Sequence, residues 1–248
     1  MKIQLRHFDT LQSTNVTAVA FAKAGAPEGT VIVAEQQDGG RGRMKRVWSS
    51  PKGGLWFTII LRPQKDPQYV AQVTLAAGVA VAKVLRKLYE SDDIRIKWPN
   101  DLLLNDKKVC GILSEMQLDE NGSIDYAVVG IGINVNLKLE DFPLELRDTA
   151  TSLNLALKKN YTCTEVLDDI MKEFESLYNQ WLEFGANAVL EPWREMNCTL
   201  NRLVFVKDND EVIFSGTVTA IDETGSIVVT NEEGACQSFD FGEISIRY

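Results

Sequence analysis

Residues 94–136 read IRIKWPNDLLLNDKKVCGILSEMQLDENGSIDYAVVGIGINVN. Short apolar runs in this stretch are separated by Pro99, by Asn105-Asp106 and by residues 119–122, DENG. Runs of this length between turn-forming residues are typical of buried strands. Proline ends a strand because it has no N–H to donate, and Asn and Asp favour tight turns. We predict four strands, 94–98, 101–105, 108–117 and 123–136, which form a meander on the core sheet.

Toward the N-terminus, the same pattern predicts a first strand containing His7 and buried strands at 30–35 (TVIVAE) and 55–61 (LWFTIIL). A Ser/Thr N-cap and Gly25 as the stop predict a short helix at 15–24. Apolar residues in helical spacing predict a long helix from Pro67 to about residue 90.

Toward the C-terminus, Thr162 to Glu165 matches a capping box and predicts a core-packing helix to Phe184, followed by a short helix at 187–196. From about residue 200 the chain becomes short alternating strands at 202–207, 211–222, 226–232 and 238–248. This pattern is typical of a small β-barrel. We therefore predict an α+β domain of residues 1–199 and a barrel of residues 200–248.

Composition limits the classes of protein. The chain has 248 residues, 45% hydrophobic and 25% charged, with no run of eighteen apolar residues and no signal-peptide pattern at its start. We expect a cytoplasmic protein without a membrane partner. The four cysteines lack CxxC spacing, which favours reduced, structural thiols. His7 is the only histidine, so His-rich metal sites are excluded.

Residues 36–54, QQDGGRGRMKRVWSSPKGG, hold five cationic side chains and one Asp, although the chain has a formal net charge of -9. The glycines let backbone N–H groups turn toward one ligand while Arg41 and Arg43 close on it, which favours a phosphate guest. A solvated charged face is the alternative. Nucleic acid is disfavoured because the rest of the chain is acidic.

Lys97 ends an apolar strand, where burying its charge is costly unless it meets an anion. The alternative is a snorkelling edge lysine, with Asn100 and Asp101 as turn formers. Together with the glycine-arginine loop, these residues are the parts needed to hold a carboxylate beside a phosphate.

The motifs STN at 13–15, GRGR at 40–43 with Trp48, KWPND at 97–101, GIL at 111–113, GIGINVN at 130–136 and GEISIR at 242–247 occur in the order seen in biotin protein ligases. The chain resembles this family along its whole length, in the form without an N-terminal DNA-binding domain. It departs from the family pattern at Met44-Lys45-Arg46, where a glycine is usual at the position of Lys45.

The resemblance implies a mixed β-sheet catalytic domain of the biotin/lipoate ligase type, followed by an SH3-like β-barrel. It also implies that biotin and ATP, with Mg²⁺, give biotinyl-5'-AMP and pyrophosphate, and that biotin passes to one lysine of a biotin carboxyl carrier domain. A carboxylate that attacks a polyanion needs charge neutralisation and positioning more than proton transfer.

The resemblance also implies roles for individual residues. The catalytic residues would be Lys97 and Arg43. Biotin would be bound by Ser13, Thr14, Asn15, Gln37, Gly40, Arg41, Gly42, Arg43, Lys97 and Gly111. ATP and the adenylate would be bound by Arg41, Arg43, Arg46, Trp48, Lys97, Asn100 and Asn134. Asp101 is a weaker candidate for Mg²⁺, which takes few protein carboxylates beside phosphate oxygens.

Two other functions stay open at this point. One is a lipoate or octanoate ligase or transferase of the same fold, and the other is a non-catalytic module that retains biotinyl-adenylate. We expect no nucleic-acid partner. The sequence leaves open the identity of the carrier protein and the choice between monomer and homodimer.

Overall fold

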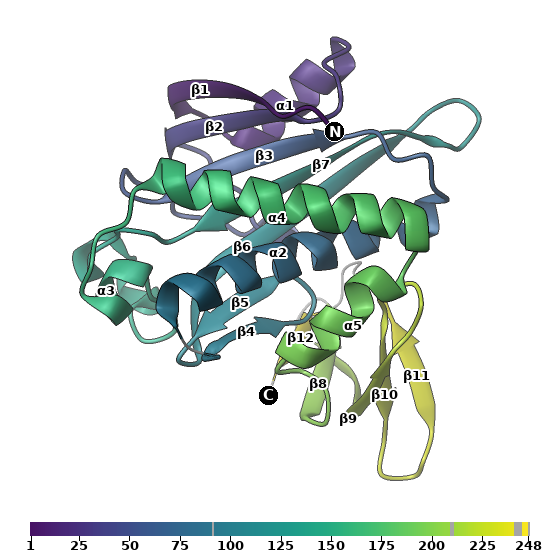
Figure 1. Cartoon of the computed structure of the whole chain (residues 1–248). Helices are drawn as coiled ribbons and strands as arrows, with labels where there is room; N and C mark the ends of the chain where they lie inside the picture. Colours follow the sequence, from purple (N-terminus) through teal and green to yellow (C-terminus); the bar gives the residue numbers. More distant parts are fainter. Residues whose placement is uncertain (91, 209–210, 241–244, 248) are drawn as a thin grey trace.

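The computed structural model describes residues 1–90, 92–208, 211–240 and 245–247, and it contains a large and a small β-sheet (Figure 1). The large sheet has seven strands in the order β1-β2-β3-β7-β6-β5-β4. Its strands are β1 (Gln4–Leu11), β2 (Thr30–Gln37), β3 (Leu55–Leu61), β4 (Ile94–Lys97), β5 (Asp101–Leu104), β6 (Lys107–Leu118) and β7 (Ile124–Ile133). Only the β1–β2 pair is parallel among these described strands, so the sheet is mixed, as predicted.

The α-helices lie on both faces of the large sheet. They are α1 (Thr14–Lys23), α2 (Ala71–Tyr89), α3 (Leu153–Leu157), α4 (Cys163–Phe184) and α5 (Asn187–Met196). Side chains alternate across a strand, so Phe57 and Ile59 of β3 pack in one cluster with α2 and α4, whereas Ile60 packs with Ala18 and Ala22 of α1. Figure 1 shows α2 and α4 stacked side by side over one face of the sheet.

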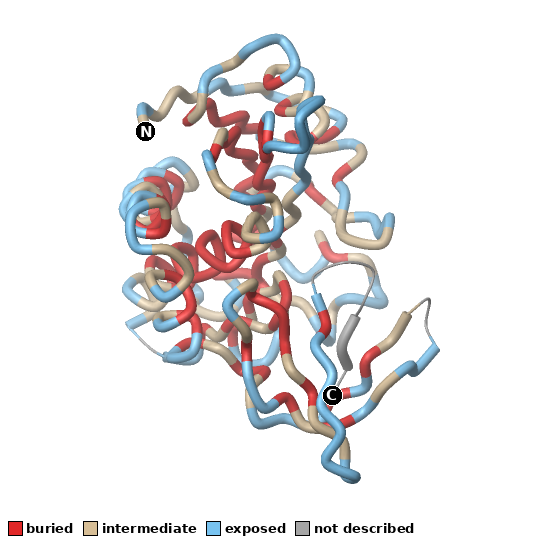
Figure 2. The backbone as a smooth tube through the Cα atoms, turned by 90° about the vertical axis from the view of Figure 1, so that its right-hand side faces the viewer, coloured by how far each residue is buried: buried red, intermediate tan, exposed pale blue. Residues whose placement is uncertain are grey.

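Helix α2 is the buried centre of the fold. Residues 67–89 form a segment long and apolar enough to cross a membrane. However, 72% of its most apolar stretch of 18 residues is buried inside this structure. The helix packs between the sheet, α4 and α5, and Figure 2 shows its buried course through the molecule. Its apolar surface is therefore accounted for by core packing.

Most of the helices and strands predicted from the sequence are confirmed, and three details of the prediction are corrected. Thr162 is the N-cap of α4, but its side chain makes no capping hydrogen bond, so the capping box is wrong. Pro67 starts a 3-10 turn, Pro67–Tyr69, and α2 begins only at Ala71. Residues 238–248 are not one strand, because β11 ends at Phe239 and the chain re-enters the small sheet at its opposite edge; residues 241–244 lie outside the described part.

The small sheet has five antiparallel strands in the order β11-β10-β9-β8-β12. They are β8 (Leu203–Asp208), β9 (Glu211–Ile221), β10 (Ile227–Thr230), β11 (Cys236–Phe239) and β12 (Ser245–Arg247). Val204, Val206 and Val218 belong to the same buried cluster as α2. Closure of this sheet as an SH3-like barrel and the boundary at residues 199/200 stay predictions.

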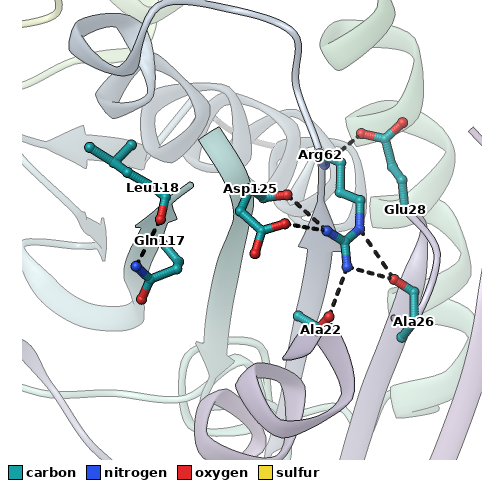
Figure 3. Close-up of polar contacts among 7 residues, drawn as sticks. All are labelled: Ala22, Ala26, Glu28, Arg62, Gln117, Leu118 and Asp125. Carbon is teal, nitrogen blue, oxygen red and sulfur yellow. Dashed lines mark hydrogen bonds and ion pairs between the residues drawn. The ribbon is translucent and has the colours of Figure 1, made fainter. Parts of the chain in front are cut away.

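Arg62, directly after β3, fastens the C-terminal end of α1 to the sheet (Figure 3). Its guanidinium donates to the carbonyls of Ala22 and Ala26 and to Asp125, with distances of 2.8–3.3 Å. Helix C-terminal carbonyls lack intrahelical partners, so a cation there is favourable. The clamp thus fixes the C-terminal end of α1 against β3 and β7.

Candidate functional site

A cleft of about 290 Å³ opens on the α1 face of the large sheet. Most of the predicted site residues line it. They are Ser13, Thr14, Asn15, Gln37, Arg41, Gly42, Arg43, Arg46, Trp48, Lys97, Asn100, Asp101, Gly111 and Asn134. Gly40 is not among the lining residues: its carbonyl accepts from the Trp48 N–H at 2.9 Å, and a Cβ there would come within 2.3 Å of the Trp48 carbonyl. Gly40 thus permits the backbone segments at residues 40 and 48 to approach each other closely, beside the cleft.

Glycines form the floor of the cleft. Gly111 of β6 lies opposite Gly132 of β7, and Gly130 follows on the same face of β7. A Cβ on Gly130 would lie 1.9 Å from Asn15 Oδ1, and one on Gly132 would lie 2.6 Å from Trp48 Nε1. These glycines therefore leave room for Asn15 and Trp48 to lie directly over the sheet.

A hydrogen-bonded network closes one end of the cleft. The Gln37 side-chain oxygen accepts from the Thr14 backbone N–H at 2.7 Å and from the Thr14 hydroxyl at 3.0 Å. Asn15 Nδ2 donates to the Leu113 carbonyl at 3.1 Å and to Glu115 Oε2 at 2.8 Å; Glu115 itself is not among the residues that line the cleft. The hydroxyl of Thr58, which is fully buried in β3, donates to Thr14 Oγ1 and Asn15 Oδ1, both at 2.8 Å, and shares its one proton between them. This end offers fixed, neutral hydrogen-bonding groups.

Cationic side chains dominate the rest of the cleft. Among the described lining residues these are Arg41, Arg43, Arg46, Lys97 and Lys108, and the only carboxylate is Asp101. Arg43 also donates to Asn100 Oδ1 at 3.4 Å. Burial lowers the pKa of Arg43; the carboxylates of Asp101 and Asp240 oppose this shift, and Arg46 adds to it. An arriving anion would stabilise this half-buried charge.

The sequence analysis missed Thr58 and Lys108. Lys108 Nζ lies 2.6 Å from Asp101 Oδ1 and 5.0 Å from the centre of the Trp48 ring. It therefore combines an ion pair with a cation–π contact at the cleft wall. Asp101, predicted as a weak Mg²⁺ ligand, has one oxygen engaged by this lysine. The hairpin turn at Asn105-Asp106, which folds Lys108 back toward Asp101, is the sequence signal that could have found the pair.

The glycine-arginine loop, residues 39–47, hereafter the basic loop, forms a small hairpin at the cleft mouth. Arg41 pairs with Val47, and the Gly42 N–H donates to the Arg46 carbonyl at 2.8 Å. Met44 and Lys45 both have positive φ, 54° and 58°. Lys45 occupies the position where the resemblance leads us to expect glycine, and a positive φ is the backbone conformation that favours glycine. Lys45 thus keeps the positive φ that favours glycine at this position of the loop.

Trp48 gives the cleft an aromatic wall. Its ring packs edge-on against Trp56 at a centroid distance of 6.4 Å, and its buried Nε1 has no hydrogen-bond partner in the described part of the chain. Nearby, Asn134 Nδ2 donates to the Thr151 carbonyl at 3.0 Å, so this side chain also holds the segment that borders the cleft.

No group of three or more His, Cys, Asp or Glu side chains is placed to hold a metal among the described residues. Asp101 is the one carboxylate among the described residues that line the cleft, which fits an ion held mainly by phosphate oxygens and does not fit a dedicated protein cage. All four cysteines lie in the described part and none forms a disulfide there, and burial raises the pKa of the Cys110 thiol.

Two family models match this chain. Residues 8–134 match the biotin/lipoate A/B protein ligase family, and residues 199–247 match the biotin protein ligase C-terminal domain. The first match contains most of the residues that line the cleft.

Known proteins resemble the chain over most of its length. The bifunctional ligase/repressor BirA of Bacillus subtilis is 39% identical over 233 residues, which is 93% of this chain and 70% of that protein. The biotin–[acetyl-CoA-carboxylase] ligase of Paracoccus denitrificans is 38% identical over 124 residues, about half of each chain. The biotin protein ligase from Aquifex aeolicus, solved in complex with biotin and ATP, is 30% identical, covers 98% of both chains and gives a TM-score of 0.84.

Proposed function

Because the chain belongs to the biotin/lipoate A/B protein ligase family, we propose that the cleft between α1 and the basic loop is where biotin and ATP react. The protein is an ATP-dependent biotin protein ligase, which activates biotin as biotinyl-5'-AMP and transfers it to a carboxylase. One observation supports this location: a neutral hydrogen-bonding end and a cationic end meet in one cleft.

The neutral end suits the ureido ring of biotin. Ser13, Thr14, Asn15 and Gln37 would provide its hydrogen-bonding partners, since a neutral polar ring needs directional groups in a closed slot. The Gly111 backbone would form the wall beside the ring. In this arrangement the carboxylate of biotin points toward the cations.

The cationic end suits the reacting groups. A biotin carboxylate oxygen bonds to the α-phosphorus of ATP while the bond to the β-phosphate oxygen breaks, so biotinyl-5'-AMP and pyrophosphate form. Lys97, Arg41 and Arg43 would neutralise the negative charge that gathers there. Trp48 and Asn134 would contact adenine, and Asn100 and Arg46 would contact the phosphates. Mg²⁺, where present, would shield the phosphate oxygens, with Asp101 as the nearest carboxylate.

Transfer follows in the same cleft. The uncharged amine of the carrier lysine attacks the acyl carbon of the adenylate, an amide C–N bond forms, the C–O bond to AMP breaks, and the amine releases a proton to solvent. We propose the biotin carboxyl carrier domain of a carboxylase as the acceptor and the cytoplasm as the compartment. The lack of a nucleic-acid partner stays a prediction. The choice between monomer and homodimer stays open.

The test is exchange of labelled pyrophosphate into ATP, run in parallel with biotin and with lipoate. We expect exchange with biotin and none with lipoate, followed by label on one lysine of a carrier domain. Exchange that depends on lipoate would favour the alternative ligase. Adenylate that forms but never reaches a carrier lysine would favour the non-catalytic module.

A further inference from the structure

The strand that carries Lys97 is held from outside the large sheet. β4 is an edge strand, and the segment after α5 lies against it, with Ile96 bridged to Asn197. The Cys198 N–H donates to the Ile96 carbonyl at 2.9 Å, and the Trp98 N–H donates to Thr199 Oγ1 at 2.9 Å. These are the two peptide groups that flank Lys97. Both are therefore fixed by residues 198 and 199.

The small sheet accepts a hydrogen bond from the side chain that follows Lys97, Trp98. Trp98 Nε1 donates to the Gly225 carbonyl at 3.1 Å, and the Gln72 side chain donates to the Glu223 carbonyl. Trp98 and Gln72 are each 1% exposed, and Thr199 is fully buried. Buried donors need acceptors, so these bonds fix where the turn between β9 and β10 docks.

The turn between β9 and β10 is held by hydrogen bonds to one side chain. The Asp222 carboxylate accepts from the Thr224 N–H at 2.9 Å, the Thr224 hydroxyl at 2.6 Å, the Ser226 N–H at 3.0 Å and the Ser238 hydroxyl at 3.0 Å. Gly225 has a φ of +94°, where another residue would be strained. The turn thus presents its carbonyls to the large sheet in one fixed geometry.

We propose that Thr199, supported by the Gly225 carbonyl, is a positioning residue for Lys97. It holds the Lys97–Trp98 peptide so that the lysine side chain enters the cleft at the place where the carboxylate meets the α-phosphate. The small sheet thereby contributes to the first chemical step without touching the substrate. This inference rests on the proposed role of Lys97 in adenylate formation.

A matched set of variants tests it. Thr199→Val keeps the shape of the side chain but removes the acceptor for the Trp98 N–H, and Thr199→Ser keeps the hydroxyl. Gln72→Leu, on α2, which carries no proposed site residue, removes the hydrogen bond to the Glu223 carbonyl of the same turn and also the acceptor for Trp181 Nε1. Trp98→Phe, which removes the bond to the Gly225 carbonyl and keeps an aromatic ring, is the second variant if Thr199→Val does not fold.

The readouts are kcat and KM for biotin in pyrophosphate exchange, with Tm measured for every variant. We expect Thr199→Val to lower kcat by about 10- to 100-fold, the scale for a misplaced catalytic group, with KM for biotin little changed and activity restored in Thr199→Ser. Gln72→Leu should lower Tm but keep its kcat.

Two results would overturn the inference: a folded Thr199→Val with the kcat of the wild type, or an equal loss of kcat in Gln72→Leu at similar Tm. A wild-type protein without biotin-dependent exchange would instead overturn the proposed function. The two failures are therefore distinguishable.

Discussion

At the residue scale, Lys97 connects the chemistry of the cleft to the architecture around it. Its strand ends at the cleft, and both of its peptide groups are hydrogen-bonded to the segment after α5. In the part of the chain that the structure describes, the four other cations lining the cleft lie on the basic loop or on β6. The backbone on both sides of Lys97 is thus anchored, which suits a group that must be preorganised.

We predict that Lys97→Ala slows adenylate formation by about 10²- to 10³-fold, the scale for losing one preorganised electrostatic donor. The far-UV circular dichroism and Tm should stay close to those of the wild type. Lys87→Ala, at an exposed position of α2, is the matched control and should keep full activity. A folded Lys97→Ala protein that exchanges pyrophosphate at the wild-type rate would show that the assignment is wrong.

Thr58 tests the neutral end of the cleft. Thr58→Val removes the hydroxyl that holds Thr14 and Asn15 and leaves their oxygens without this donor. We predict a rise in KM for biotin of about ten-fold, equivalent to ~1.4 kcal/mol for one lost buried hydrogen bond. KM for ATP should change little, and Thr58→Ser should restore biotin binding. A rise in both KM values to the same extent would argue against a role confined to the biotin end.

Sequence motifs predicted most of the cleft because glycines, arginines and the KWPND run have local signatures. Thr58 could not be predicted this way: it lies in an apolar run, LWFTIIL, and its partners are 43 and 44 residues away in the sequence. Lys108 was missed in part for a similar reason: the local hairpin turn brings it to Asp101, but its contact with Trp48 depends on the loop between β2 and β3 lying against β6. Contacts between residues far apart in the chain produce no periodic pattern in the sequence.

At the element scale, the strands flanking the basic loop and the helix after Pro67 were predictable, because β-branched runs and helical apolar spacing are local properties. The order of strands was not. β3 pairs with β7 across a long sequence separation, and the last strand of the small sheet joins the edge opposite β11. Residues 238–248 look like one strand because the alternation of side chains continues past the point where β11 ends.

The basic loop carries the second element-scale argument. Its three glycines and its clustered cations give it few apolar contacts of its own, so we expect the loop to order when an anion arrives. Arg43→Ala should then weaken retention of the adenylate more than its synthesis. The released adenylate would label lysines of an unrelated protein in the same tube.

Two measurements check this prediction. The first is protease cleavage between residues 39 and 46, which should be slower with biotin plus ATP than without them. The second is biotin label on the unrelated protein, which should be greater with Arg43→Ala than with the wild type. Equal cleavage in both states, together with an active variant that labels no bystander, would contradict closure of the loop.

At the scale of the whole molecule, the two sheets share one core. Val204, Val206, Ile221 and Phe239 of the small sheet belong to the buried cluster that contains α2 and α4. Buried hydrogen bonds from Trp98 and Gln72 cross the same contact. Separate domains usually unfold independently, but a continuous core couples them.

We therefore predict one cooperative thermal transition for the wild type, with equal calorimetric and van't Hoff enthalpies. Asp222→Ala should lower Tm and separate the unfolding of the small sheet, because the turn loses the acceptor that shapes it. Asp169→Ala, at an exposed ion pair on α4, is the control and should change little. Two separate transitions in the wild type would contradict the shared core.

The pH dependence gives an independent check on the same residue. Burial alone would raise the pKa of Asp222, but hydrogen bonds from Thr224, Ser238 and the backbone of Ser226 and Thr224 outweigh it, so the native pKa lies below the ordinary value. A lowered native pKa means that the carboxylate stabilises the fold above its unfolded pKa, and that this contribution is lost as pH falls through the native pKa. The difference in Tm between wild type and Asp222→Ala should therefore be full at pH 7 and shrink in acid. A difference that stays constant into acid would mean that the side chain acts by packing, and that its charge does not hold the turn against the large sheet.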